Sequence, residues 1–265
     1  MKAIFRFLFV ATMILGVRLF ASDADQWKIQ ITGLRIVAPP AEKKEGAQGA
    51  FFQPPGVTVV AALTPAQGKI VSIDQFKSKV DSFTDDKGTD LLAAKSDSPF
   101  NKPGFGMMDA KEACATVEIQ AAGLPAKGAS ALNISGTITA KIAAGTREFT
   151  IESADITNGT HFTCGELPIE ITKAGLSKAM FSNEKEFSVT FSSAKDLESI
   201  STLDFFDAQG TKLEARKSEW GGGMGSYMVV YVFKKGVDRA KIVATCWTDL
   251  KTVEVPLSVK TGVGL

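Results

Sequence analysis

Residues 83–91 read FTDDKGTDL, and residues 205–213 read FFDAQGTKL. Phe, Asp, Gly, Thr and Leu coincide between the two segments, 122 residues apart. In both places a Lys-Ser pair, a loop with Gly and Met, two strand-like runs and a short closing strand follow in the same order. Similarity at a fixed spacing indicates a repeated structural unit, and this spacing suits a whole domain rather than a solenoid repeat. The sequence therefore predicts two tandem, related domains.

The local pattern around these segments is typical of β-strands. Residues 27–32, 132–142 and 187–191 alternate apolar and polar side chains, as half-buried strands do. At Gly33 the alternation changes parity, which predicts a β-bulge. Turn sequences such as residues 86–88 separate the strands, and no long helical stripe occurs. We therefore expect an all-β protein with two β-sandwich domains, comparable in fold to immunoglobulin-like or fibronectin-like domains.

The N-terminus predicts a cleavable export signal. Lys2 and Arg6 precede an apolar run at residues 7–17, and the small residues Ala21 and Ala24 offer two cleavage positions. The apolar run is too short to cross a hydrocarbon layer of about 30 Å as a helix, although an uncleaved signal anchor is an alternative. We expect an exported protein, periplasmic or extracellular, with a signal peptide at residues 1–24, a first domain at residues 25–152 and a second at residues 153–265.

The charge balance argues against a nucleic-acid partner. The formal charge of the chain is +1, and removal of residues 1–21 takes away three basic residues and no acid, which leaves −2. A protein that binds nucleic acid presents a basic patch to the phosphates, and the sequence holds no Lys/Arg-rich run. After the signal, no segment approaches the eighteen consecutive apolar residues of a membrane span. We expect no transmembrane segment in the mature chain.

Few residues in this sequence suit catalysis. His161 is the single histidine, so a metal site with several histidine ligands cannot form, and a Ser-His-Asp triad would have to use this residue. The nucleophile motif Gly-x-Ser-x-Gly is also missing. We expect no cofactor, no metal and no enzyme activity. The function expected is binding or structural, with a cell-surface glycan or protein as the partner. The alternative is a small secreted hydrolase that uses a pair of carboxylates, because such a pair meets only in the folded chain.

Three cysteines are too few to form the main framework of a chain this long. Cys164 and Cys246 fall in strand-like segments of the same half, and an exported chain meets an oxidising compartment. We predict a disulfide between Cys164 and Cys246 and a free Cys114. Three buried thiols are the alternative.

The second half also predicts a contact surface. Residues 227–233 and 241–247 are apolar at nearly every position, unlike the alternating strands of the first half. If Ile242, Ala244 and Cys246 face the core, Val243 and Trp247 point outwards. An open apolar face of several hundred Å² usually marks a contact surface. We therefore expect a partner, another part of the chain or a ligand to cover a face formed by Trp220, Tyr227, Val243 and Trp247.

Overall fold

The computed structural model of the chain describes residues 27–38, 55–93, 104–111, 113–178, 185–223 and 225–263, so the predicted signal peptide lies outside the described residues. The described ranges are all-β: they form strands and one short 3-10 helix, η2 (Leu197–Ser199). None of their helices is long and apolar enough to cross a membrane. The strands are β1 (Trp27–Val37), β2 (Gly56–Pro65), β3 (Lys69–Asp85), β4 (Gly104–Lys111), β5 (Cys114–Ala121), β6 (Ala131–Ala143), β7 (Gly145–Asp155), β8 (Thr160–Cys164), β9 (Leu167–Lys178), β10 (Lys185–Ser193), β11 (Ile200–Phe206), β12 (Ala215–Gly223), β13 (Ser226–Phe233), β14 (Arg239–Thr248) and β15 (Lys251–Gly262).

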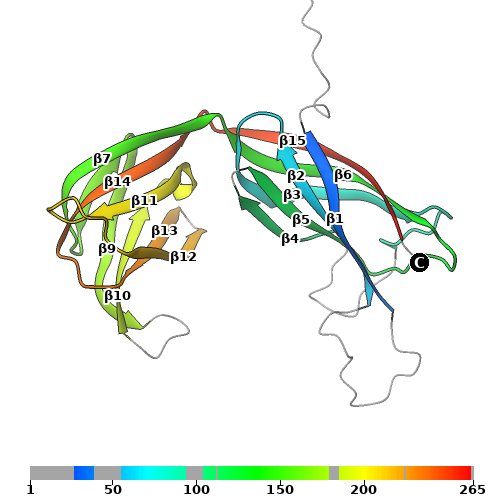
Figure 1. The fold of residues 1–265 in the computed structure, drawn as a ribbon, viewed down its shortest axis with the longest axis horizontal. Helices are drawn as coiled ribbons and strands as arrows, with labels where there is room; N and C mark the ends of the chain where they lie inside the picture. The colour runs from blue at the N-terminus through cyan, green and yellow to red at the C-terminus, as the bar shows by residue number, and fades with distance from the viewer. Residues whose placement is uncertain are drawn as a thin grey trace, which may run out of the picture.

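The strands pair antiparallel in four sheets, which Figure 1 shows as two lobes. The sheets β1-β2-β5-β4 and β15-β6-β3 form the first lobe. The sheets β12-β13-β10-β9-β8 and β11-β14-β7 form the second lobe, in which β8 is an additional edge strand. The first lobe therefore takes its last strand from the C-terminal end of the chain, whereas all strands of the second lobe lie between residues 145 and 248.

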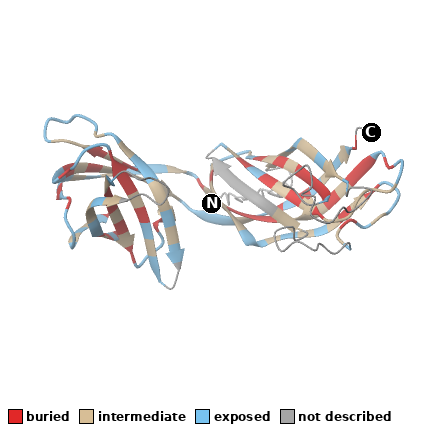
Figure 2. Cartoon of the chain, turned by 90° about the horizontal axis from the view of Figure 1, so that it is seen from below, coloured by how far each residue is buried: buried red, intermediate tan, exposed pale blue. Residues whose placement is uncertain are grey.

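Each lobe encloses its own hydrophobic cluster between its two sheets, as the buried strips in Figure 2 indicate. In the second lobe the cluster centres on Phe205, whose ring lies 4.9 Å from Phe233 and 5.2 Å from Tyr231, centroid to centroid. Such edge-to-face pairs add about 0.5–1.5 kcal/mol to the burial of the rings themselves. The first cluster includes Phe83 and Ile119, which are fully buried. The arrangement in each lobe is sandwich-like.

The alternation in the sequence places side chains as predicted. In β14, Ile242, Ala244 and Cys246 are buried in the second cluster, while Val243 and Trp247 are only half-buried. In β1, the register against β2 shifts between Ile31 and Gly33, so the predicted bulge is present. The alternation with a period of two thus identified the core face of β14 and the position of the bulge in β1.

The repeated sequence forms the same turn in both lobes. In each copy the Asp carboxylate accepts hydrogen bonds from the N–H groups two and four residues later, and the final Leu N–H donates to the carbonyl of the initial Phe. The donors are Lys87 (2.9 Å), Thr89 (2.8 Å) and Leu91 (2.9 Å) after β3, and Gln209 (2.9 Å), Thr211 (2.8 Å) and Leu213 (2.8 Å) after β11. Gly88 and Gly210 adopt φ of 85° and 80°, a region that favours glycine. The turn chemistry expected from the sequence is confirmed.

The sheets do not divide the chain at residue 153, where the sequence predicted a boundary. Ser153 lies inside β7, and β7 pairs with β14 of the second lobe. The last strand, β15, pairs with β6 of the first lobe instead of staying with its neighbours in sequence. Both strands alternate well enough to complete either lobe, so local pattern does not specify which partner each of them takes.

Candidate interaction surface

The predicted contact residues Trp220 and Tyr227 lie together on the hairpin of β12 and β13. Trp220 pairs with Val229 and Tyr227 with Gly222, and residues paired in this way share a face of the sheet. Val229 is buried, so this face is the one turned toward the core. A Cβ on Gly222 would lie 2.4 Å from Cδ1 of Tyr227, so the Tyr227 ring occupies the space above that glycine. Because β12 is an edge strand, this face opens to solvent at its side.

Trp220 covers the open edge of the second lobe. Its side chain is 57% exposed, yet it lines a small cavity above the core. The remaining lining residues come from η2 and from strands β11, β12 and β13, and they are Leu197, Ile200, Leu203, Lys217, Val229 and Tyr231. Partial burial lowers the pKa of Lys217. Tyr231 accepts a hydrogen bond from the Leu203 N–H (3.3 Å), and burial raises its pKa.

Val243 and Trp247 lie elsewhere, on the outer face of β14. Their paired neighbours are polar: Val243 pairs with Thr150 and Asp204, and Trp247 with Thr146. The Nζ atom of Lys69, in the first lobe, lies 5.6 Å from the centre of the Trp247 ring, a cation–π distance. The four residues expected to form one contact surface therefore occupy two different sheets. The apolar composition of β13 and β14 led to the single surface, because sequence shows neither that these strands lie in different sheets nor that Trp220 and Tyr227 lie on the core-facing side of theirs.

The most exposed aromatic in the described chain is Phe76, which the sequence pattern did not indicate as a contact residue. Its side chain is 98% exposed, at the tip of a bulge where the pairing of β3 with β6 skips from Asp74 to Lys79. A signal for this bulge does exist in the sequence, since the apolar residues Ile73 and Val80 have opposite parity within one strand. In a regular strand, two residues of opposite parity lie on opposite faces, so only one of them could face the hydrophobic core.

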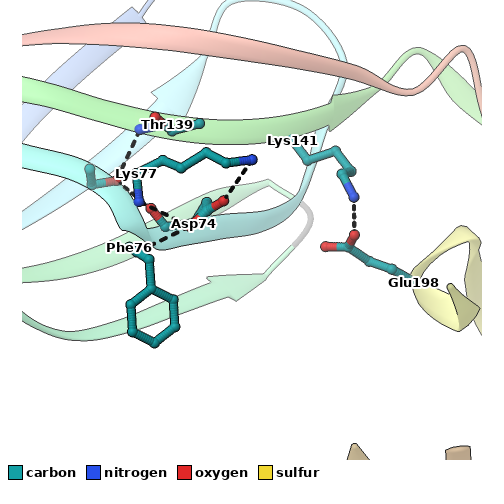
Figure 3. A network of polar contacts seen from close by, with 7 residues as sticks. Asp74, Phe76, Lys77, Thr139, Lys141 and Glu198 are labelled. Atoms are coloured by element: carbon teal, nitrogen blue, oxygen red, sulfur yellow. Dashed lines mark hydrogen bonds and ion pairs between the residues drawn. The ribbon is translucent and has the colours of Figure 1, made fainter. Parts of the chain in front are cut away.

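Polar contacts hold the Phe76 bulge in place, as Figure 3 shows. One carboxylate oxygen of Asp74 accepts hydrogen bonds from the N–H groups of Phe76 (3.0 Å) and Lys77 (3.1 Å). The Ser78 hydroxyl donates to the Asp74 carbonyl (2.7 Å) and accepts from the Thr139 N–H of β6 (3.0 Å). Burial would raise the pKa of Asp74, but the N–H groups of Lys77 and Phe76 and the Lys77 ammonium lower it. The Phe76 ring therefore projects from a structured support.

Phe76 and Trp220 both lie near the contact between the lobes. Lys141 of β6 forms an ion pair with Glu198 of η2 across that contact. Leu197, which precedes Glu198, lines the cavity covered by Trp220. On the other lobe, the Phe76 bulge lies beside residues 137–139 of β6, the same strand that carries Lys141. We call the sides of the two lobes that face each other in Figure 1 the inner sides; β4 and β12, both edge strands, lie there.

The predicted disulfide is not formed in the structure, in which Cys114, Cys164 and Cys246 are free thiols. Cys164 and Cys246 are both buried in the second cluster. Burial, with a smaller effect of the neighbouring Cys246, raises the pKa of Cys164 to about 12. Burial also raises the pKa of Cys246. A thiol held in its protonated form is a poor nucleophile, so neither residue is suited to covalent chemistry.

Two carboxylates do share a pocket. Glu186 and Glu214 line a pocket of about 380 Å³ at the start of β12, but each is engaged by a cation: Arg216 lies 2.7 Å from Glu186 and Lys234 lies 2.9 Å from Glu214. Within the described ranges no group of His, Cys, Asp and Glu could hold a metal ion. His161 is exposed on β8, where it pairs with Glu170.

Comparison with known proteins gives no relative from which a function could be transferred. No protein-family model, curated protein or solved structure matches the chain.

Proposed function

We propose that this chain is an exported, non-enzymatic binding protein that recognises a protein component of the cell surface through the inner sides of its two lobes. The observation that carries the proposal is Phe76, a 98% exposed phenylalanine on a bulge fixed by Asp74 and Ser78. Burial of a phenylalanine side chain is worth about 1.5–3 kcal/mol. A structure that holds this ring in water forgoes that stabilisation, which a partner could recover.

Trp220 supports the same location. Tryptophan is enriched among the residues that dominate binding energy at interfaces, and Trp220 is exposed beside the contact between the lobes. Its strand, β12, offers one free edge among the described residues. On β4, the other edge strand of the inner sides, the Phe105 carbonyl already accepts a hydrogen bond from the Gln75 side chain (3.2 Å). Free strand edges present unpaired backbone groups, to which an extended protein segment can add as a further strand. This favours a protein partner over a glycan.

The hydrolase alternative has one supporting observation, the pocket shared by Glu186 and Glu214. A glycoside hydrolase needs one carboxyl group that holds a proton to donate. Here each carboxylate forms an ion pair with a basic side chain, Glu186 with Arg216 and Glu214 with Lys234. We therefore rank this alternative second. Hydrolysis of chromogenic glycosides by the purified chain, abolished by Glu214→Gln, would restore it.

The proposal also includes export of the chain by an N-terminal signal peptide and an origin of its two lobes as related domains. The charged and apolar pattern of residues 1–24 supports a signal peptide. The shared turns at Asp85 and Asp207 support two related sandwich domains. An export assay with residues 1–24 fused to a reporter tests the first of these points.

Binding to the cell envelope of the source organism tests the function. We expect Phe76→Ala and Trp220→Ala each to weaken binding of the purified chain about tenfold, or about 1.4 kcal/mol. Leu176→Ala is the matched control, because Leu176 is 71% exposed but lies on β9. Protease treatment of the envelope should remove binding. Wild-type affinity in a Phe76→Ala, Trp220→Ala double variant would contradict the proposal, and protease-resistant binding to a glycan array would change the partner class.

A further inference from the structure

The larger sheets of the two lobes have the same strand order. The first lobe has β1-β2-β5-β4, and the second has β9-β10-β13-β12 with β8 outside β9. Counted in chain order from β1 in the first lobe and from β9 in the second, each sheet uses the first, second, fifth and fourth strand. Each strand of the larger sheet in the first lobe thus has an equivalent eight strands later.

The smaller sheets follow this rule for two strands and break it for the third. They are β3-β6-β15 in the first lobe and β11-β14-β7 in the second. Strand β11 is the equivalent of β3, and β14 that of β6. The equivalent of β7 is β15, but each of these two strands lies in the other lobe. The repeated turns follow β3 and β11, which fixes the equivalence independently of the strand count.

The crossing point between the lobes shows how β7 and β15 each come to lie in the other lobe. Strands β6 and β7 are separated by Ala144 alone, and β14 and β15 by Asp249 and Leu250. A single register continues through the junction, from the pair Ala131 and Gly262 to the pair Ile151 and Ile242. The Ala144 N–H donates to the Thr248 carbonyl (3.1 Å), so the pairing is kept at the crossing itself. Figure 1 shows the resulting two-stranded ribbon between the lobes.

We infer that the two lobes are copies of one seven-stranded unit that have exchanged their last strands within a single chain. In an unexchanged arrangement, β6–β7 and β14–β15 would each be a hairpin, and the chain would reverse at Ala144 and at Asp249. In the observed arrangement the chain bends at Ala144 and at Asp249 but does not reverse, and it continues from one lobe into the other. Each lobe keeps a full set of strands, and the lobes are joined by two paired strands instead of one linker.

The exchange has a mechanical consequence. A single linker would leave the lobes free to rotate, as is the default for domains with a small interface. The ribbon adds cross-strand hydrogen bonds, and the contacts Lys141–Glu198 and Lys69–Trp247 brace it from the side. The relative position of the inner sides is therefore built into the strand pairing. This inference concerns the architecture and holds whether or not the proposed binding function does.

Cleavage of the folded full chain tests the exchange. One variant carries a specific protease site at Ala144, a second at Leu250 and a third at both. After folding and double cleavage, we expect residues 145–249 to separate on size exclusion from a complex of the N-terminal fragment with residues 251–265. The singly cleaved chains are the controls and should remain one body. In the unexchanged arrangement, residues 145–249 would hold both other fragments, and co-elution of all three would overturn the inference.

A second measurement covers variants that fail to fold. Ser135 and Ser258 are Cα partners on β6 and β15, so Ser135→Cys with Ser258→Cys should form a disulfide within one chain on oxidation. Peptide mapping identifies the bond. Its absence in folded protein, or a bond only between two chains, would overturn the exchange within one chain.

Discussion

At the scale of single residues, the two copies of the repeated turn differ in one useful way. Asp85 is buried and accepts a third backbone hydrogen bond, from Ala126 (2.7 Å), while Asp207 is half-buried. Burial alone would raise the pKa of Asp85, but the N–H groups of Ala126, Thr89 and Lys87 lower it to about 2. The carboxylate thus joins the turn to a loop far along the chain.

We predict that Asp85→Asn lowers the free energy of unfolding more than the matched change Asp207→Asn. Since the folded state lowers the pKa of Asp85 to about 2 from its ordinary 3.8, the stabilisation is present above about pH 4 and is lost as the pH falls toward 2. Urea titrations at pH 7 and pH 2.5 check both points. The difference between wild type and Asp85→Asn should shrink at the lower pH, and a difference independent of pH would contradict this account.

The cysteines give a second prediction at this scale. Because burial raises the pKa of Cys164 and Cys246, these thiols should resist alkylation in the native protein, whereas the half-buried Cys114 should react first. Mass spectrometry of native and urea-unfolded chains after iodoacetamide treatment counts the reactive thiols. Three thiols on unfolding agree with the free thiols of the structure. One thiol would restore the disulfide expected from the sequence for Cys164 and Cys246.

At the scale of elements, the sequence predicted what depends on near neighbours. The period of two identified the core face of β14, and Gly33 marked the bulge of β1. The Phe76 bulge was missed because its signal, the changed parity between Ile73 and Val80, is spread over seven residues. Apart from Phe76, the residues of the bulge (Gln75, Lys77 and Ser78) are polar and resemble an ordinary turn.

We predict that Asp74→Ala loosens this bulge without unfolding the lobe. The change removes the acceptor of two N–H groups, those of Phe76 and Lys77, at an exposed site. Loss of such a local hydrogen bond costs about 0.5–1.5 kcal/mol. Amide hydrogen exchange should accelerate at Phe76 and Lys77 and stay unchanged in β6 except at Thr139, whose N–H donates to Ser78 of the bulge. Asp81→Ala is the control, since Asp81 only pairs with Lys79 at the surface. Equal effects of both variants would show that Asp74 does not support the bulge.

At the scale of the whole molecule, local sequence pattern does not decide which strands each lobe takes. The repeat at residues 83–91 and 205–213 led to two related halves, and the structure has two lobes with two separate cores. The sequence did not allow us to predict which strands β7 and β15 pair with, because β-pairing joins residues distant in sequence. Both strands carry alternating apolar residues, so either lobe could accept them. Only the long-range register shows which lobe each strand completes.

Leu257 distinguishes the strand assignment seen in the structure from the domain boundary near residue 153 that the sequence predicted. It lies on β15 and is buried in the core of the first lobe, although it belongs to the second half of the sequence. Truncation of a buried leucine to alanine costs about 2–5 kcal/mol. We therefore predict that Leu257→Ala destabilises the first lobe. Tryptophan fluorescence can follow each lobe separately, since Trp27 lies in the first and Trp220 and Trp247 in the second.

The measurement uses two sets of tryptophan variants as backgrounds. In the first, Trp220 and Trp247 are replaced by phenylalanine, and Trp27 reports unfolding of the first lobe by urea. In the second, Trp27 is replaced, and the remaining tryptophans report the second lobe. Leu257→Ala should lower the midpoint only in the first background, and Val189→Ala, in the core of the second lobe, should lower it only in the second. The opposite response to Leu257→Ala would return β15 to the second lobe and restore the boundary near residue 153.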